Sequence, residues 1–387
     1  MPLPDYQGHS IVNLMSSLGQ ALGAKVNDYP LLVDLPPEQL RDSRNIILLV
    51  IDGLGYKYLL NSDQDGCLHR HLHAQITSVF PSTTATAITT FMTGQAPQQH
   101  GLTGWHTYLK ELGCVTAVLP LRPRVAAGGF NSNTFDVHQL YGHTPFFDLI
   151  ERPSYVVAPE WIIHSEYNVA HSGSALLHGY NSLNQCFQNI DMIIKASARN
   201  KYIYAYWPDF DRYSHESGCN SPRVDRHFAE LDEAFARLLD KLAGTNTSVI
   251  VTADHGFIDT ETSRVIHLAD HPVIQDALVL PLCGEPRAAY CYVHPHKVQQ
   301  FTDYVINELA DHVDLKTADQ LVEEGWFGCG TSHPRLIERI GHYVLIMKDN
   351  YVVKDRLVGE PPFVHVGVHG GISAEEMYVP LIFAQCP

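Results

Sequence analysis

Two side chains suited to metal chemistry stand next to each other in the second half of the chain. Asp254 and His255 directly follow the apolar run 248–251. A run of this kind predicts a buried strand, so the pair lies at a strand's carboxyl end, where open α/β sheets place ligands. A carboxylate beside an imidazole is costly to hold there unless a cation satisfies both, and a divalent metal ion is the obvious candidate.

Three other segments carry carboxylates or imidazoles in similar settings. Asp52 ends the continuous apolar run 45–51, which predicts a second buried strand. Asp211 and His215 are four residues apart, so they face the same side of a helical turn. His369 lies close to the C-terminus, in front of two glycines.

A fifth segment supplies hydroxyl groups. Residues 80–87 read FPSTTATA and run on to MTG and HG. The stretch 83–91 predicts a helix that begins just after the proline, which places a hydroxyl at a helix N-terminus, where anions bind favourably. Three Asp, three His and a hydroxyl are what two divalent ions and an activated alkoxide need. Two ions about 4 Å apart stabilise the attacking and leaving oxygens of phosphoryl transfer, and coordination activates a hydroxyl.

These groups must be positioned by alternating strands and helices. Helices are expected at 9–22 and 224–242, and strands at 45–51, 115–119, 155–158, 202–206, 248–251 and 343–347. Such alternation favours an α/β fold with a mainly parallel sheet and helices on both faces. Residues 277–340 are interpreted as a small inserted α/β lobe within a single domain 1–387. The lobe would hold a strand at 288–293 and a helix at 297–309. The core is expected to resume with a hairpin at 343–355.

Composition limits the partners. The 387 residues include 26 basic and 42 acidic ones, a formal charge of −16, which argues against duplex nucleic acid but leaves room for a small phosphorylated substrate. The eight cysteines form no CxxC pair and are expected to be reduced thiols. We see neither a signal peptide nor an apolar run long enough to span a membrane, and so expect a cytoplasmic protein without a membrane partner. Oligomeric state is not readable from the sequence.

In their order along the chain, the five segments resemble the alkaline phosphatase superfamily, and most closely its nucleotide pyrophosphatase/phosphodiesterase branch, the type I phosphodiesterases. The resemblance spans about residues 45–382, apart from the inserted lobe, and implies an alkaline-phosphatase-like core. It implies one metal ion on Asp211, His215 and His369. It implies a second ion on Asp52, Asp254 and His255, with the nucleophile oxygen of Thr84 as a further ligand. Zinc is the family's usual metal, and this mixed ligand set suits it.

The resemblance therefore implies a two-metal phosphohydrolase that acts through a phosphothreonine at Thr84, on a phosphodiester or nucleotide-like substrate. Ala87 departs from the family, which has a phosphoryl-binding Asn three residues after the nucleophile. That difference leaves a phosphomonoesterase or phosphonate hydrolase as an alternative, and a metal-stabilised binding protein as an alternative without catalysis. The sulfatase signature, a Cys or Ser followed by x-Pro-x-Arg, is not matched at 84–88.

Several neighbouring residues compete for these roles. They are Asp209 for Asp211, His365 for His369, and Ser82, Thr83 and Thr86 for Thr84. His100, His267 and His271 are either at the mouth of the site or ordinary loop residues. Tyr213, Trp326 and Phe327 either stack on a nucleobase or pack in the interior.

Overall fold

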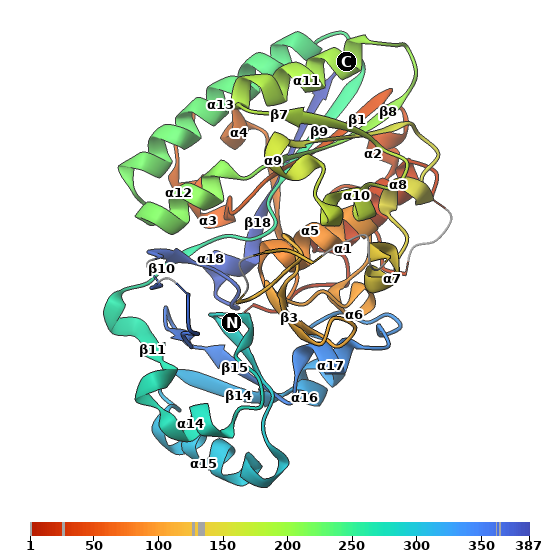
Figure 1. Ribbon diagram of the computed structural model, residues 1–387. Helices are drawn as coiled ribbons and strands as arrows, with labels where there is room; N and C mark the ends of the chain where they lie inside the picture. Colours follow the sequence, from red (N-terminus) through yellow and green to blue (C-terminus); the bar gives the residue numbers. More distant parts are fainter. Residues whose placement is uncertain (1, 25–27, 126–127, 131–135, 361, 364) are drawn as a thin grey trace.

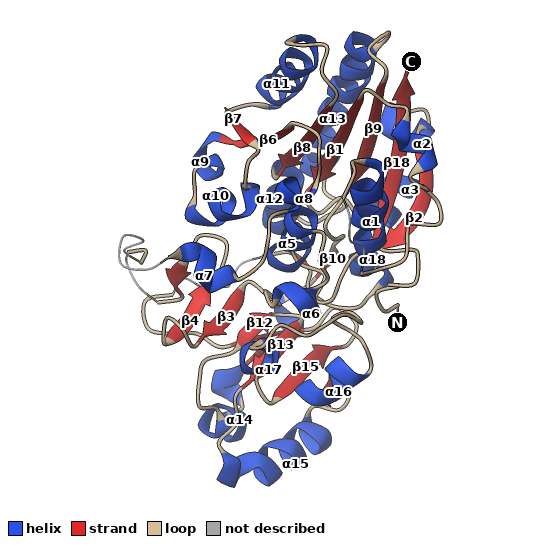
Figure 2. Ribbon diagram, turned by 90° about the vertical axis from the view of Figure 1, so that its right-hand side faces the viewer, coloured by secondary structure: helices blue, strands red, loops and turns tan. Residues whose placement is uncertain are grey.

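The structure, a computed structural model, describes residues 2–24, 28–125, 128–130, 136–360, 362–363 and 365–387. Two seven-stranded sheets lie at opposite ends of the molecule, with helices α5 and α6 between them (Figures 1 and 2). The strands of the larger sheet, in spatial order, are β2 (Leu72–Thr77), β18 (Tyr378–Cys386), β9 (Thr247–Thr252), β1 (Asn45–Ile51), β8 (Lys201–Trp207), β6 (Ser154–Pro159) and β7 (Leu176–Tyr180).

The larger sheet is mainly parallel, as the sequence predicts. Strands β9, β1, β8, β6 and β7 pair in parallel, and β18 runs antiparallel to β9 and β2. All seven residues of β1 are buried, because helices cover both faces of this sheet and the strand has no face turned to water. The predicted core strand at 45–51 is therefore confirmed residue for residue.

Helices cover both faces of the larger sheet (Figure 1). One layer contains α1 (Ile11–Ala21), α5 (Thr84–Thr93), α8 (Phe146–Leu149) and α10 (Glu166–Ser172), and the other contains α4 (Cys67–Arg70), α11 (Leu183–Lys195) and α13 (Pro222–Leu242). The longest, α13, begins with a Ser221 side-chain cap and Pro222, and it buries its apolar stripe from Val224 to Leu242. The shorter helices are α2 (Glu38–Arg41), α3 (Tyr56–Asn61), α6 (Pro97–His100), α7 (Val137–Tyr141), α9 (Glu160–Ile163), α12 (Asp209–Ser217) and α18 (Ala374–Met377).

The smaller sheet is antiparallel and draws on distant parts of the chain. Its order is β14 (Val313–Thr317), β15 (Tyr343–Met347), β13 (Ala288–Cys291), β12 (Cys283–Glu285), β3 (His106–Leu109), β4 (Cys114–Ala117) and β5 (Arg122–Pro123). Helices α14 (Pro272–Ala277), α15 (Val298–Glu308), α16 (Ala318–Glu323) and α17 (Leu336–Ile340) belong to this half of the molecule. The sheet thus extends beyond 277–340, because the strands expected at 115–119 and 343–347 pair here and not with the larger sheet.

The hairpin predicted at 343–355 is wrong. Strand β15 pairs with β13 and β14, whereas β16 (Val352–Lys354) pairs in parallel with β11 (Val265–His267). Strand β16 does not fold back on β15, because two hydrogen bonds tie Asn350 to another part of the chain. The Asn350 carbonyl accepts a hydrogen bond from the Thr260 hydroxyl, and the Asn350 side-chain amide donates one to the Asp259 carbonyl. A further short pair, β10 (Ile258–Asp259) with β17 (Gly367–Val368), completes the link between the two sheets.

Two expectations about the chain as a whole can be compared with the structure. All eight cysteines are free thiols, in agreement with the expectation of reduced cysteines. Within the described residues, no helix is both long enough and apolar enough to cross a lipid bilayer.

Candidate active site

The predicted site residues leave the carboxyl ends of three adjacent parallel strands. Asp52 follows β1, Asp254 follows β9, and Asp211 and His215 lie on α12, which begins after β8. Because β9, β1 and β8 are neighbours in that order, their carboxyl ends open at one edge of the sheet. The sequence therefore placed these side chains at the correct edge.

His369 reaches the same place from the far end of the chain. It directly follows β17, whose partner β10 begins three residues after His255. The antiparallel pairing of these two short strands brings the C-terminal segment against the loop after β9. The rings of His255 and His369 stack with their centroids 3.7 Å apart.

The first predicted triad is compact. The Nε2 atoms of His215 and His369 are 3.2 Å apart, and they lie 3.5 and 3.8 Å from Oδ1 of Asp211. These three atoms surround a common point at distances that a single metal ion would bridge. The structure thus brings Asp211, His215 and His369 together as the resemblance implied.

The second predicted triad is equally compact and is fully buried. Nε2 of His255 lies 3.2 Å from Oδ1 of Asp52 and 3.5 Å from Oδ2 of Asp254. The same nitrogen is 3.9 Å from Oδ1 of Asp211, so the two triads adjoin. We call Asp52, Asp211, His215, Asp254, His255 and His369 the Asp/His cluster.

The carboxylates of the cluster lack protein partners on the side that faces its centre. Oδ1 of Asp52, Oδ1 of Asp211 and Oδ2 of Asp254 are buried without a hydrogen-bond donor in the described part of the chain. Burial, followed by repulsion from Asp211, raises the pKa of Asp52 well above its usual range. Burial also raises the pKa of Asp211 to about 7 and that of Asp254 to about 8. Three converging buried carboxylates with raised pKa values form a site that a bound cation would stabilise.

The three imidazoles of the cluster are oriented by the backbone. Nδ1 of His215 lies 2.8 Å from the Gly367 carbonyl, Nδ1 of His255 lies 3.0 Å from the Gly256 carbonyl, and Nδ1 of His369 lies 3.2 Å from the Ser82 carbonyl. A carbonyl oxygen can only accept, so each Nδ1 carries a hydrogen, and each Nε2 points to the cluster. Burial lowers the pKa of His215 to about 4, and that of His369 well below its usual range, which keeps both rings neutral.

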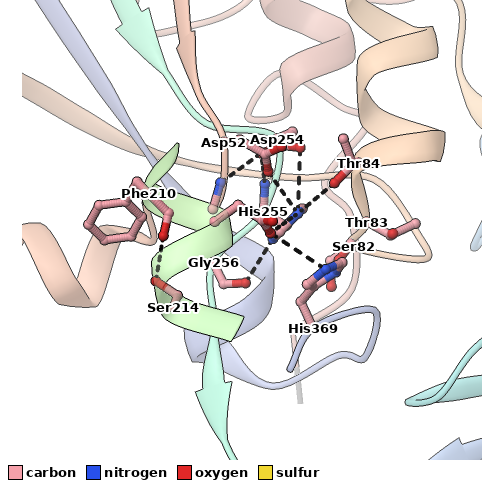
Figure 3. A network of polar contacts seen from close by, with 12 residues as sticks. Asp52, Ser82, Thr83, Thr84, Phe210, Ser214, Asp254, His255, Gly256 and His369 are labelled. Atoms are coloured by element: carbon pink, nitrogen blue, oxygen red, sulfur yellow. Dashed lines mark hydrogen bonds and ion pairs between the residues drawn. The ribbon is translucent and has the colours of Figure 1, made fainter. Parts of the chain in front are cut away.

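Thr84 points into the cluster from the first position of α5 (Figure 3). Its hydroxyl lies 3.2 Å from Nε2 of His255. The first backbone N–H groups of a helix have no intrahelical acceptor, so an anion beside this hydroxyl meets free donors and the positive end of the helix dipole. Helix α5 begins where the sequence predicted and ends at Gly94, which adopts a left-handed conformation.

Two glycines allow the loops of the cluster to pack closely. Gly53 follows Asp52 at φ +77°, and a Cβ there would lie 2.4 Å from the Phe257 ring. A Cβ on Gly256 would lie 2.0 Å from the Glu375 carbonyl oxygen. Both positions therefore require glycine, because a side chain after Asp52 or after His255 would clash with its neighbours.

Most competitors named in the sequence analysis have other partners. The Asp209 carboxylate pairs with Arg212 at 3.0 Å and lies outside the cluster. The Ser82 hydroxyl donates to the Gly371 carbonyl, and the Thr83 hydroxyl donates to Glu285. The Thr86 hydroxyl is buried and has no partner among the described residues. Of the four hydroxyls, the described contacts direct only that of Thr84 to the cluster.

The remaining candidate residues of the sequence analysis lie beside the cluster, in the protein interior or elsewhere on the surface. His365 is exposed and its ring lies 4.4 Å from that of His215, so it borders the cluster. Trp326 and Phe327 pack in the interior against Phe80, and His100 is fully buried. The Tyr213 ring is contacted by the guanidinium groups of Arg212 and Arg223, each 4.4 Å from its centre. His271 contacts the Tyr304 hydroxyl, and His267 is exposed at the end of β11.

Ala87 is fully buried in the main hydrophobic core. An alanine side chain supplies no polar group to a bound phosphoryl group, so the donor that the family's asparagine provides is missing from this position. The alternative functions that the sequence left open on account of Ala87 therefore stay open.

The sequence analysis did not identify the residues that hydrogen-bond to the cluster or to the loops that carry its residues. Tyr206, on β8, donates its hydroxyl to Oδ2 of Asp52. Glu285, on β12 of the smaller sheet, accepts the Thr83 hydroxyl and the Trp105 amide, each at 2.7 Å. Glu376 accepts the Gly371 amide at 2.8 Å and forms a buried pair with Arg287. The spacing of Ser373 and Glu376 is a capping-box signal, but it predicts only a helix start and not these contacts.

The residues present fit two divalent cations. Each triad offers carboxylate oxygens and imidazole nitrogens, the donor types that zinc accepts, and the buried carboxylate oxygens that lack donors in the described structure face the same space. His255 is within reach of both groups, since it clusters with Asp52 and Asp254 and also with Asp211 and His369.

Comparison with known proteins agrees with this geometry. The sequence model of one family, described as "Type I phosphodiesterase / nucleotide pyrophosphatase", matches residues 46–371. Murine ectonucleotide pyrophosphatase / phosphodiesterase 5 has a similar fold, with a TM-score of 0.66 and 18% identity, over 87% of each chain. The human protein of that name gives 0.65 and 16%, also over 87% of each chain. One similar structure is an inactive threonine-to-alanine variant of the murine protein in complex with AMP, with a TM-score of 0.66, 18% identity and 87% of each chain covered.

Proposed function

The chain belongs to the type I phosphodiesterase / nucleotide pyrophosphatase family and is thus a hydrolase of phosphoric esters, and from this premise we propose that it cleaves a phosphodiester or nucleotide pyrophosphate bond through Thr84. The observation that carries the proposal is the convergence of buried carboxylate oxygens that lack donors, neutral imidazoles and one hydroxyl at a helix N-terminus. A binding protein without catalysis would not require that hydroxyl.

The two triads of the Asp/His cluster would each hold one divalent ion, with zinc as the expected metal. When bound, such ions polarise phosphoryl oxygens and stabilise the negative charge of the attacking and leaving oxygens. The protein's own part is to hold the Thr84 oxygen beside that position and to keep the imidazole and carboxylate donors fixed.

The reaction begins at Oγ1 of Thr84, which forms a bond to phosphorus while the bond from phosphorus to the leaving oxygen breaks. In the structure the Thr84 hydroxyl lies within hydrogen-bond distance of Nε2 of His255. With both ions bound that nitrogen would be a ligand, and the hydroxyl proton would leave to water, because metal coordination would lower the pKa of the hydroxyl. The free amides of the first turn of α5 face the transferred phosphoryl group and favour its charge. Water then hydrolyses the phosphothreonine and restores the hydroxyl.

Metal content and substrate preference test the proposal together. Elemental analysis is expected to find about two zinc ions per chain. Bis-p-nitrophenyl phosphate should be cleaved faster than p-nitrophenyl phosphate, because a diester is the substrate of the family. Preference for the monoester would indicate a phosphatase, and the absence of any bound metal would refute the proposed chemistry.

Thr84→Ala tests the nucleophile. We expect the rate to fall by about a thousandfold or more, with metal content unchanged, because the group that forms the bond is removed. Thr86→Ala is the matched control two residues along the same helix, since its buried hydroxyl has no partner in the described structure. It should retain near-normal activity. Loss of metal or of folding in Thr84→Ala would assign the threonine a structural role instead.

A further inference from the structure

Lys354 is a partly buried ammonium group near the Asp/His cluster, and among the described residues it forms no direct ion pair. It ends β16 and is only partly exposed. The Phe363 ring contacts it, with its centre 4.7 Å from Nζ, and no ion pair or hydrogen bond joins this ammonium to another described residue. Burial lowers the pKa of Lys354. In a chain with a net charge of −16, a partly buried cation that lacks a direct ion pair within the described residues is unusual.

The acidic residues nearest to Lys354 along the chain are already paired. Arg124 holds Oδ1 of Asp355 at 2.6 Å and Oε1 of Glu360 at 2.7 Å, and its own side chain is 5% exposed. The Asp355 carboxylate also accepts the Leu282 amide. Both carboxylates are thus held directly by the Arg124 guanidinium. Together with Glu285 they act on Lys354 only as longer-range charges, so no direct ion pair within the described residues competes with a ligand for the ammonium.

A row of rings connects this ammonium to the cluster. The Phe363 ring lies 5.0 Å from the ring of His365, which lies 4.4 Å from that of His215. Lys354 also acts on groups on two sides of the site. Burial raises the pKa of Glu285 and Lys354 counteracts that rise, whereas burial, with a smaller contribution from Lys354, lowers the pKa of His215 to about 4. The ammonium therefore lies at the rim on the side of His215.

We propose that Lys354, with the rings of Phe363 and His365, forms a subsite for a second anionic group of the substrate, separate from the phosphoryl group that reacts at Thr84. The substrate class is a phosphodiester or pyrophosphate with additional negative charge, such as the further phosphates of a nucleotide. This inference rests on the proposed function, because it places the reacting phosphorus at the Asp/His cluster.

The test compares a substrate that carries extra charge with one that does not. ATP, cleaved to AMP and pyrophosphate, has additional phosphates, whereas bis-p-nitrophenyl phosphate carries only the charge of its reacting phosphodiester. Lys354→Met keeps the apolar stem and removes the charge. We expect the KM for ATP to rise about tenfold, the scale of one lost charged contact, with kcat/KM for the diester within about twofold of wild type. Lys354→Arg should restore most of the affinity for ATP.

If Lys354→Met lost activity equally on ATP and on the diester, Lys354 would act only on the fold or on Glu285. If the variant changed activity on neither substrate, the subsite would also be refuted. A binding measurement separates this result from failure of the proposed function. Calorimetry with ADP compares Thr84→Ala with the double variant Thr84→Ala/Lys354→Met, and it needs no turnover. We expect the double variant to bind ADP about tenfold more weakly. Equal affinities would refute the subsite even if the wild-type enzyme cleaved neither substrate.

Discussion

At the scale of single residues, Tyr206 decides which oxygen of Asp52 faces the cluster. Its hydroxyl donates to Oδ2, while Oδ1 is left without a donor and lies 3.2 Å from Nε2 of His255. Burial raises the pKa of Tyr206 well above its usual range, so the hydroxyl remains a donor at all relevant pH values. Tyr206 therefore orients a ligand without binding the metal itself.

We predict that Tyr206→Phe weakens metal binding by about tenfold to a hundredfold, the usual effect of removing a group that orients a ligand. A chelator competition titration measures the change. Tyr204→Phe is the control on the same strand, because the Tyr204 hydroxyl is buried without a partner in the described structure. If both variants bound metal as tightly as wild type, the Tyr206 contact would have no role in the site.

The sequence predicted the residues of the Asp/His cluster, but it did not predict the supporting residues Tyr206 and Glu285. Asp52, Asp254 and His255 directly follow apolar runs, and strand ends are visible in a one-dimensional pattern. Tyr206 and Glu285 have no such signal. Their roles depend on which strand lies beside which, and in the case of Glu285 on contact between the two sheets.

At the scale of elements, Glu376 fixes both loops that carry histidines of the cluster. Its side chain accepts the Gly371 amide, two residues after His369, and its backbone carbonyl accepts the Gly256 amide, next to His255. Arg287 holds the carboxylate through Nε at 3.0 Å and through the terminal nitrogen at 2.8 Å. One residue at the end of α18 thus connects the segments after β9 and β17.

We predict that Glu376→Gln destabilises the protein by about 3 kcal/mol at pH 7, because the buried Arg287 charge loses its partner. The Arg287 charge and its hydrogen bonds hold the pKa of Glu376 below its usual range despite burial. A depressed folded-state pKa adds stability above the unfolded-state value of about 4.3, and this stability is lost as pH falls through the lower folded value. The difference in the free energy of unfolding between Glu376→Gln and the wild type should therefore become smaller below about pH 4.

Urea denaturation across this pH range measures both effects. Glu375→Gln is the matched control, because Glu375 is next to Glu376 in the sequence, but its carboxylate is partly exposed and pairs with Lys57 at the surface. Such a pair contributes about 1 kcal/mol or less. Comparable losses in the two variants would contradict a special role for Glu376.

Local patterns predicted elements more reliably than their pairing. Helices α1 and α13 and strands β1 and β13 lie where periodicity placed them, because an apolar stripe or run is a property of the segment itself. The pairing of β15 and β16 was predicted wrongly, since a turn between two apolar runs resembles a hairpin. Hydrogen bonds from Asn350 to a segment ninety residues away redirect the chain, and they have no local signature.

At the scale of the whole molecule, the cluster makes the metal-free protein sensitive to pH. Asp211 and Asp254 have folded pKa values of about 7 and 8, raised chiefly by burial, against about 3.9 in an unfolded chain. Between these limits the folded state binds more protons than the unfolded state. The stability of the metal-free protein should therefore fall as pH rises from about 4 to 8.

Bound cations would neutralise these carboxylates and reverse the trend. A ligand that binds only the folded state at a hundred times its Kd stabilises it by about 2.7 kcal/mol. We predict that the gap in thermal midpoint between metal-loaded and chelator-treated protein is wider at pH 8 than at pH 6, and that zinc restores the midpoint. Asp211→Asn should narrow the gap, whereas Asp209→Asn should preserve it, because Asp209 pairs with Arg212 outside the cluster. Equal gaps at both pH values would mean that carboxylate repulsion does not limit the stability of this fold.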